Sequence, residues 1–168
     1  VSMVFLGCEG YIETEVKLSD LQSQKTKQID GDLYIQITSC GQYDDSRIPS
    51  DELLNSKKTI PTVFKNAKFI ECFQKEFSSF THFRIPIIIN NEQLAISNAS
   101  IGLVSTKNYP LTLIIPTSIK RNLDVVKNES MGLNDIDLKV SIKLHNDTKN
   151  DFTFEVLSAY LDGEPYIY

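Results

Sequence analysis

The clearest pattern in the chain is an alternation of apolar and polar residues from Ile136 to His145. Successive side chains of a strand point to opposite faces of a sheet, so this stretch predicts an antiparallel strand with one buried and one solvated face. His145 falls on the solvated face. The inward residues of this predicted strand are Ile136, Leu138, Val140, Ile142 and Leu144.

Other stretches extend the β pattern. Residues 33–39 alternate cleanly, and residues 68–73 are rich in aromatic and β-branched residues, so both predict strands. The run RIPIIIN contains Pro86, which lacks a backbone N–H and restricts that run to a sheet edge, a strand end or a bulge. Asp162-Gly163 predicts a hairpin turn near the end of the chain.

Turn and helix signals separate these strands. Asp30-Gly31-Asp32 predicts a turn, and the polar stretch from Ser19 to Lys27 predicts a loop. Ser50 is a good N-cap for a short helix from Asp51 to about Lys58, which Pro61 should prevent from continuing far.

A second short helix is predicted after Pro116-Thr117-Ser118 and runs to about Asn128, with Ile119, Leu123 and Val126 on one face. The elements together predict a mainly β fold, an antiparallel β-sandwich with two short helices in its connections.

Composition and charge narrow the function classes. The chain has 168 residues, enough for one domain with a substantial core. Its formal net charge of -5 argues against a general nucleic-acid binder and against electrostatic docking on anionic lipid. No apolar run approaches the roughly 20 residues that span a bilayer.

The opening residues VSMVFLGC have two interpretations. In the first, residues 1–8 are the remnant of a signal peptide whose lipobox, Phe5-Leu6-Gly7-Cys8, directs lipid onto Cys8. The basic segment of such a peptide is missing, so the chain would be truncated upstream. In the second, Ser2 to Leu6 is a strand and Cys8 is a buried small hydrophobe. With the first interpretation, residues 9–30 form a tether or first strand, and residues 31–168 form a single sandwich domain.

The other cysteines depend on that choice. If Cys8 carries lipid, Cys40 and Cys72 remain as an even pair that would close a loop of about 32 residues in an oxidising compartment. The alternative is two unrelated buried thiols. Their spacing does not fit a zinc site, which uses close pairs such as C-x-x-C.

Catalytic signals are weak. The chain lacks a G-x-S-x-G elbow, an H-E-x-x-H helix and a Gly-rich phosphate loop, so no cofactor or metal is predicted. One alternative is a small hydrolase that uses His82 with a nearby carboxylate from the 44–52 loop. The acidic cluster of that loop favours a solvated loop over a calcium site. It comprises Asp44, Asp45, Asp51 and Glu52.

Several stretches together resemble a family of small uncharacterised lipoproteins of tailed phages and prophages of enteric bacteria: GCEGYIETEVKLSDL, GDLYIQITSC, YDDSRIPSDELL, AKFIECF, FSSFTHFRIPI and AYLDGEPYIY. The resemblance covers most of the chain. It implies a lipobox before Cys8, an envelope location and a disulfide between Cys40 and Cys72. Phe5 is a departure, because the lipobox usually has Leu three residues before the cysteine. The family supplies no catalytic residues.

We therefore expect a non-enzymatic cell-envelope lipoprotein on the periplasmic side of a membrane, held there by the lipid on Cys8 alone. It would act by binding an envelope protein, for instance in superinfection exclusion or another modification of the envelope, and not nucleic acid. Exposed aromatics could form its interface: Tyr43, Tyr109, Tyr166 and Tyr168. A cytoplasmic or virion structural protein with reduced thiols is the remaining alternative.

Overall fold

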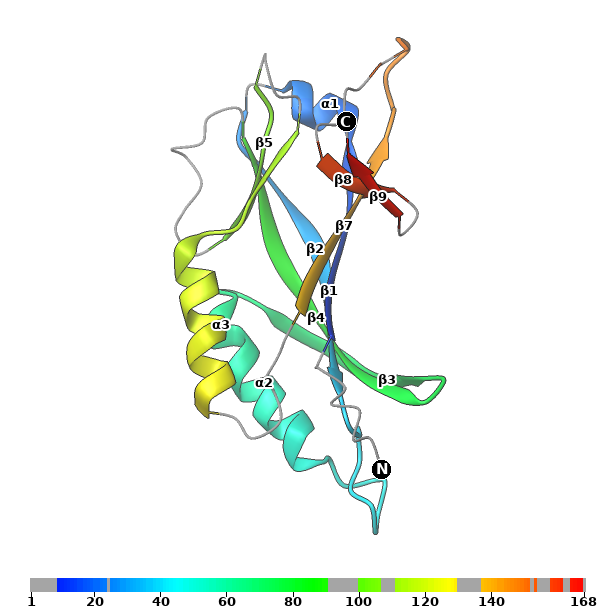
Figure 1. Ribbon diagram of the computed structural model, residues 1–168, viewed down its shortest axis with the longest axis vertical. Coiled ribbons are helices and arrows are strands. Elements are labelled where there is room, and N and C mark those ends of the chain that lie inside the picture. The colour runs from blue at the N-terminus through cyan, green and yellow to red at the C-terminus, as the bar shows by residue number, and fades with distance from the viewer. Residues whose placement is uncertain are drawn as a thin grey trace.

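A computed structural model describes residues 9–23, 25–90, 100–106, 111–129, 137–151, 153, 158–161 and 164–167 (Figure 1). The fold is mainly β, which confirms the predicted class. Its elements are β1 (Glu9–Lys17), α1 (Leu18–Gln22), β2 (Lys27–Ile37), α2 (Asp51–Val63), β3 (Lys68–Lys75), β4 (Ser78–Asn90), β5 (Ile101–Val104), β6 (Thr112–Ile114), α3 (Thr117–Glu129), β7 (Asp137–His145), β8 (Ser158–Leu161) and β9 (Glu164–Ile167).

The strands form one curled mixed sheet and one small hairpin. Seven strands pair in the order β6-β5-β4-β2-β1-β7, with β3 also paired to β4, and β8 pairs with β9. The pairs β1–β7 and β4–β5 are parallel, whereas the other pairs are antiparallel. Two stacked antiparallel sheets are therefore not the arrangement of the described strands. The predicted final hairpin is confirmed by the pairing of Leu161 with Glu164.

One edge of β4 has two partners in succession. β3 pairs with its first half as far as Arg84, and β5 begins pairing at Ile87. Pro86 lies between these two ladders and faces Asp30 of β2 on the other edge. On the edge shared by β3 and β5, the described pairs leave position 86 without a strand partner, which accounts for a residue without an N–H inside this long strand.

The core fills the space between one sheet face and the two longer helices, which lie side by side (Figure 1). Alternation along the strands directs every second side chain into this core, as the sequence pattern predicted for residues 33–37. The buried sheet residues are Ile12, Val16, Leu33, Ile35, Phe83, Ile85, Ile87, Ile89, Ile101 and Leu103, and the helices add Ile60, Val63, Phe64, Ile119 and Leu123.

Both predicted helices are confirmed. The Ser50 hydroxyl accepts a hydrogen bond from the Leu53 N–H at 3.1 Å, which caps α2 as expected. α2 continues to Val63, past Pro61, because a proline near the last turn disturbs few helical hydrogen bonds. In α3, Ile119 and Leu123 are buried on one face, whereas the side chain of Val126 lies outside the described residues.

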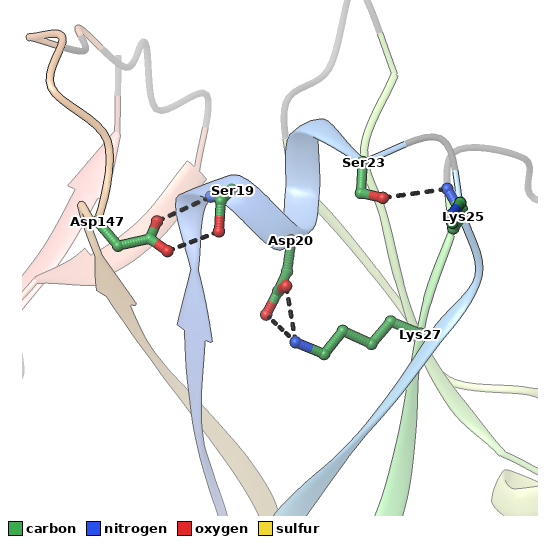
Figure 2. Close-up of polar contacts among 6 residues, drawn as sticks. All are labelled: Ser19, Asp20, Ser23, Lys25, Lys27 and Asp147. Atoms are coloured by element: carbon green, nitrogen blue, oxygen red, sulfur yellow. Dashed lines mark hydrogen bonds and ion pairs between the residues drawn. The ribbon is translucent and has the colours of Figure 1, made fainter.

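A third helix corrects the predicted loop at residues 19–27. Leu18 and Leu21 are buried and hold the single turn of α1 against the core. Figure 2 shows how Asp147, just beyond β7, accepts hydrogen bonds from the Ser19 N–H at 3.0 Å and its hydroxyl at 2.6 Å. Lys27 pairs with Asp20 at 2.7 Å. Asp147 comes from a distant part of the chain, so its contribution to the helix gives no signal in the local sequence.

The predicted turn at Asp30-Gly31-Asp32 is also wrong, because these residues lie inside β2. Gly31 faces the core, and a Cβ added there would lie 2.5 Å from Cδ1 of Ile87. The glycine therefore makes room for a core side chain and does not form a turn.

Candidate functional site

The sheet face that the helices leave uncovered carries a row of rings. Tyr11 of β1 lies opposite Tyr34 of β2, and Tyr34 lies opposite His82 of β4. Their strand neighbours Ile12, Leu33 and Phe83 point into the core. Side chains alternate along a strand, so the three rings share the opposite face.

A second row, one step along the strands, adds Phe80 of β4 and Phe73 of β3, which are directly paired. We call the surface formed by both rows the ring face. It consists of Tyr11, Tyr34, Phe73, Phe80 and His82.

The rings contact one another continuously. Tyr34 stacks on His82 with centroids 4.7 Å apart and meets Phe73 edge-on at 6.0 Å. Phe73 stacks on Phe80 at 5.8 Å, and Phe80 reaches Tyr11 at 6.4 Å. Each pair adds about 0.5–1.5 kcal/mol beyond its buried area, so the cluster is a fixed surface. His82 is only 8% exposed, whereas the other rings are half-buried.

Carboxylates flank the buried histidine. Asp32 Oδ1 lies 2.8 Å from His82 Nε2, and Glu71 Oε1 lies 3.7 Å from Nδ1. Arg84 approaches the same Asp32 oxygen at 3.7 Å. Burial, and after it the charges of Asp32, Glu13 and Glu71, raises the pKa of Tyr34 above its ordinary value. The ring face therefore has an acidic border.

Lys139 of β7 lies at the margin of the ring face, beside Tyr11. The Lys139 ammonium lies 5.5 Å from the Tyr11 ring centroid and 3.3 Å from Glu9. The Tyr11 hydroxyl also hydrogen-bonds to Glu9. The site thus combines flat apolar rings with charges at its margins, a composition suited to binding another surface.

The acids near His82 come from β2 and β3, and not from the 44–52 loop. Asp45 instead accepts hydrogen bonds from the backbone N–H and the guanidinium of Arg47 at 2.8–3.0 Å. Glu52 accepts hydrogen bonds from the N–H and hydroxyl of Thr38 at 2.7 and 2.9 Å. The bonds from Arg47 lower the pKa of Asp45. The structure therefore does not bring together the histidine and loop acids that sequence reasoning combined.

Cys40 and Cys72 form a disulfide, with Cα atoms 5.8 Å apart, which confirms the pairing. It joins the segment after β2 to β3, at the residue before Phe73 of the ring face. Cys8 lies outside the described residues.

The four predicted interface tyrosines have different outcomes. Tyr43 is fully exposed in the loop between β2 and α2 and is not one of the contacting rings of the ring face. Tyr166 is in β9 opposite Ala159, and its side chain is not described. Tyr109 and Tyr168 lie outside the described residues. The rings that do meet had one sequence signal, since Tyr34 occupies a polar-side position of an alternating strand.

His145 ends β7 and is exposed, as the alternation predicted. Within the described parts of the chain, no group of three or more His, Cys, Asp or Glu side chains could hold a metal ion. None of the described helices combines the length and the apolar character needed to cross a bilayer.

Comparison with known families gives one match. Residues 10–168 match the model of a domain of unknown function, DUF7424. The chain belongs to this uncharacterised family. Neither the curated proteins nor the solved structures contain a significant match.

Proposed function

We propose that this domain is a non-enzymatic lipoprotein of the bacterial cell envelope that binds another envelope protein through the ring face. The observation that carries the binding proposal is the continuous cluster of rings on the sheet face opposite the two longer helices, bordered by Asp32, Glu71 and Lys139. Aromatic residues are enriched in interface cores, where they bury large areas at low entropic cost.

The location is inferred from the cysteines. The Cys40–Cys72 disulfide supports an oxidising compartment such as the periplasm, because cytosolic thiols are normally kept reduced. Under this proposal Cys8 forms a thioether to a diacylglyceryl group from a phospholipid, and the headgroup phosphate leaves with the thiol proton. A peptidase then cleaves the Gly7–Cys8 bond.

The hydrolase alternative has less support. The His82 ring is 8% exposed and has a carboxylate near each nitrogen, so its environment favours a structural role under the ring face. The resemblance to phage and prophage lipoproteins supports a role in excluding a second phage, which a drop in plating efficiency on cells expressing the protein would test.

Intact mass of the natural gene product, made in a Gram-negative host, tests the attachment. A diacylglyceryl mass on a chain that starts at Cys8 supports it, and an unmodified chain that keeps VSMVFLG contradicts it. A photo-crosslinking residue at Phe73 or Tyr11 tests the binding face, with Arg121 on α3 as the control position. Adducts to one envelope protein from both ring-face positions, absent from position 121 and lost in Tyr34→Ser, support the proposal. Equal adducts from all three positions contradict it.

A further inference from the structure

Two aromatic side chains are fully exposed in the described part of the chain. Tyr43, in the loop between β2 and α2, is 104% exposed, and Phe77, in the turn between β3 and β4, is 101% exposed. Ile48 of the same loop is 47% exposed. We call these three residues the tip. Large apolar side chains displayed in this way mark contact sites.

The backbone on both sides of the tip is constrained by hydrogen bonds and by the disulfide. The Gln42 N–H donates to the Ile48 carbonyl at 2.9 Å, and Gly41 bridges to Pro49. The Cys40–Cys72 disulfide joins the base of this loop to β3, whose hairpin carries Phe77. The exposed side chains therefore project from constrained backbone, and their display is a feature of the fold.

The chain enters the sheet at the same end. Figure 1 places the start of β1, the loop after β2 and the β3–β4 hairpin in the lower half of the molecule, away from α1. Gly10 lies opposite Ile35, and Ile35 lies opposite Thr81. Ser78, where β4 begins, is three residues from Thr81, which corresponds to about 10 Å along an extended strand, and Phe77 lies in the turn beyond it.

Chain length then limits how far an anchor can hold this end from a membrane. Cys8 is two residues before Gly10, so its Cα lies within about 7 Å of Gly10. The distance that Cys8 can reach from Gly10 is therefore shorter than the distance by which the β3–β4 hairpin extends beyond the row of Gly10, Ile35 and Thr81. A lipid on Cys8 would bring the tip to the bilayer surface.

We propose that the tip inserts into the interfacial region of the bilayer to which Cys8 is anchored. The inference rests on the proposed lipid attachment and adds a second contact with the same membrane. Amphipathic and aromatic rings are favoured at the boundary between headgroups and acyl chains. A lipid chain and a few inserted rings together also bind more firmly than one chain alone.

The acidic residues beside the tip disfavour an electrostatic contact with anionic headgroups, so the contact would depend on the apolar side chains. Asp44 and Asp51 are exposed near the tip, and Asp45 is already paired with Arg47. These acids would be repelled by anionic lipid. Insertion should therefore persist on zwitterionic bilayers and at high salt.

Tryptophan reporters test the contact, since the chain has no native tryptophan. Full-length lipidated variants Phe77→Trp and Tyr43→Trp would be reconstituted in vesicles of phosphatidylethanolamine and brominated phosphatidylcholine. Gln22→Trp, exposed on α1 at the other end, is the matched control. Interfacial groups bury roughly 5–10 Å into the headgroup–acyl boundary, so we expect both tip reporters to be quenched about twofold and blue-shifted.

The outcomes separate this inference from the proposed function. Quenching at positions 77 and 43 but not at 22 supports the bilayer contact. A chain with the lipid mass but with tip reporters no more quenched than position 22 overturns the contact and leaves the attachment intact. A chain without lipid overturns both.

Discussion

Asp32 and His82 are joined diagonally across two strands. Direct register places Tyr34 opposite His82 and Arg84 opposite Asp32, yet the short contact of 2.8 Å runs from His82 Nε2 to Asp32 Oδ1. The diagonal gives the almost fully buried ring a polar partner and leaves its flat side for Tyr34. A buried ring nitrogen without such a partner would lose its hydration without compensation.

Removing the Asp32 carboxylate should therefore destabilise the fold. We expect Asp32→Ala to cost about 1–3 kcal/mol of unfolding free energy, measured by urea denaturation, because His82 is left without its closest acceptor. Asp30→Ala is the matched control, since Asp30 is exposed on the same strand and face, and it should change stability by less than about 0.5 kcal/mol. Equal losses in the two variants would show that the diagonal bond is unimportant.

The disulfide between Cys40 and Cys72 should contribute substantially to the stability of the fold. Replacing both Cys40 and Cys72 by Ser should lower the unfolding free energy by about 3–4 kcal/mol, because the unfolded chain regains the freedom of a loop with a separation of 32 residues. Denaturant unfolding with and without reductant measures this loss. Reductant should weaken the natural chain and leave the double variant unchanged, and an effect on both would contradict the assignment.

Two glycines should differ in their response to alanine. At Gly31 the added Cβ meets the end of the Ile87 side chain, which can shift, so we expect Gly31→Ala to cost about 1–3 kcal/mol. At Gly41 it would lie 2.5 Å from the backbone oxygen of Ser46, which cannot shift without opening the loop.

Amide hydrogen exchange distinguishes the two effects. Gly41→Ala should remove the protection of the Gln42 and Ile48 amides, and Gly31→Ala should leave it in place. Retained protection in Gly41→Ala would mean that the loop tolerates a side chain at this position.

The attachment of α1 should depend on pH. Hydrogen bonds from the Ser19 hydroxyl and N–H lower the pKa of Asp147 below its ordinary value of 3.8. The folded pKa is the lower one, so the stabilisation is complete above the unfolded pKa and is lost as pH falls through the folded pKa. Protection of the Ser19 amide, followed by hydrogen exchange, should therefore fall in acid below about pH 4.

Asp147→Asn should lower that protection at neutral pH and remove most of its acid dependence. A variant that keeps the acid dependence of the natural chain would assign it to another group. Asp151→Asn, which changes an exposed acid slightly further along the same segment, is the control.

Sequence reasoning succeeded where local patterns decide the structure. The alternation in β2 and β7, the Ser50 cap and both longer helices follow from residues that are close in the chain. The antiparallel pairing predicted for residues 136–145 is wrong, because β7 pairs in parallel with β1. Sequence reasoning failed where a distant partner decides. Strand β2 has a glycine at position 31 because the Ile87 side chain fills the space that a Cβ would need. Leu18–Gln22 is helical because Asp147 and the core hold it.

The candidate site lay beyond sequence reasoning for the same reason. The rings of the ring face come from four strands, and the strand order β3-β4-β2-β1 that makes them neighbours cannot be read from alternation. Sequence considerations located the cysteine pair, because only a few cysteines had to be assigned.

The parallel pairing of β1 with β7 also governs when this sheet can be completed. Glu9 of β1 is the register partner of Asp137 of β7, so a chain emerging from a ribosome or a translocation channel exposes the edge of β1 until most of the sequence has followed. Such long-range contacts also slow folding. We therefore expect the nascent domain to depend on chaperones, and a premature stop before residue 137 to leave the edge of β1 unpaired with β7 and prone to aggregation.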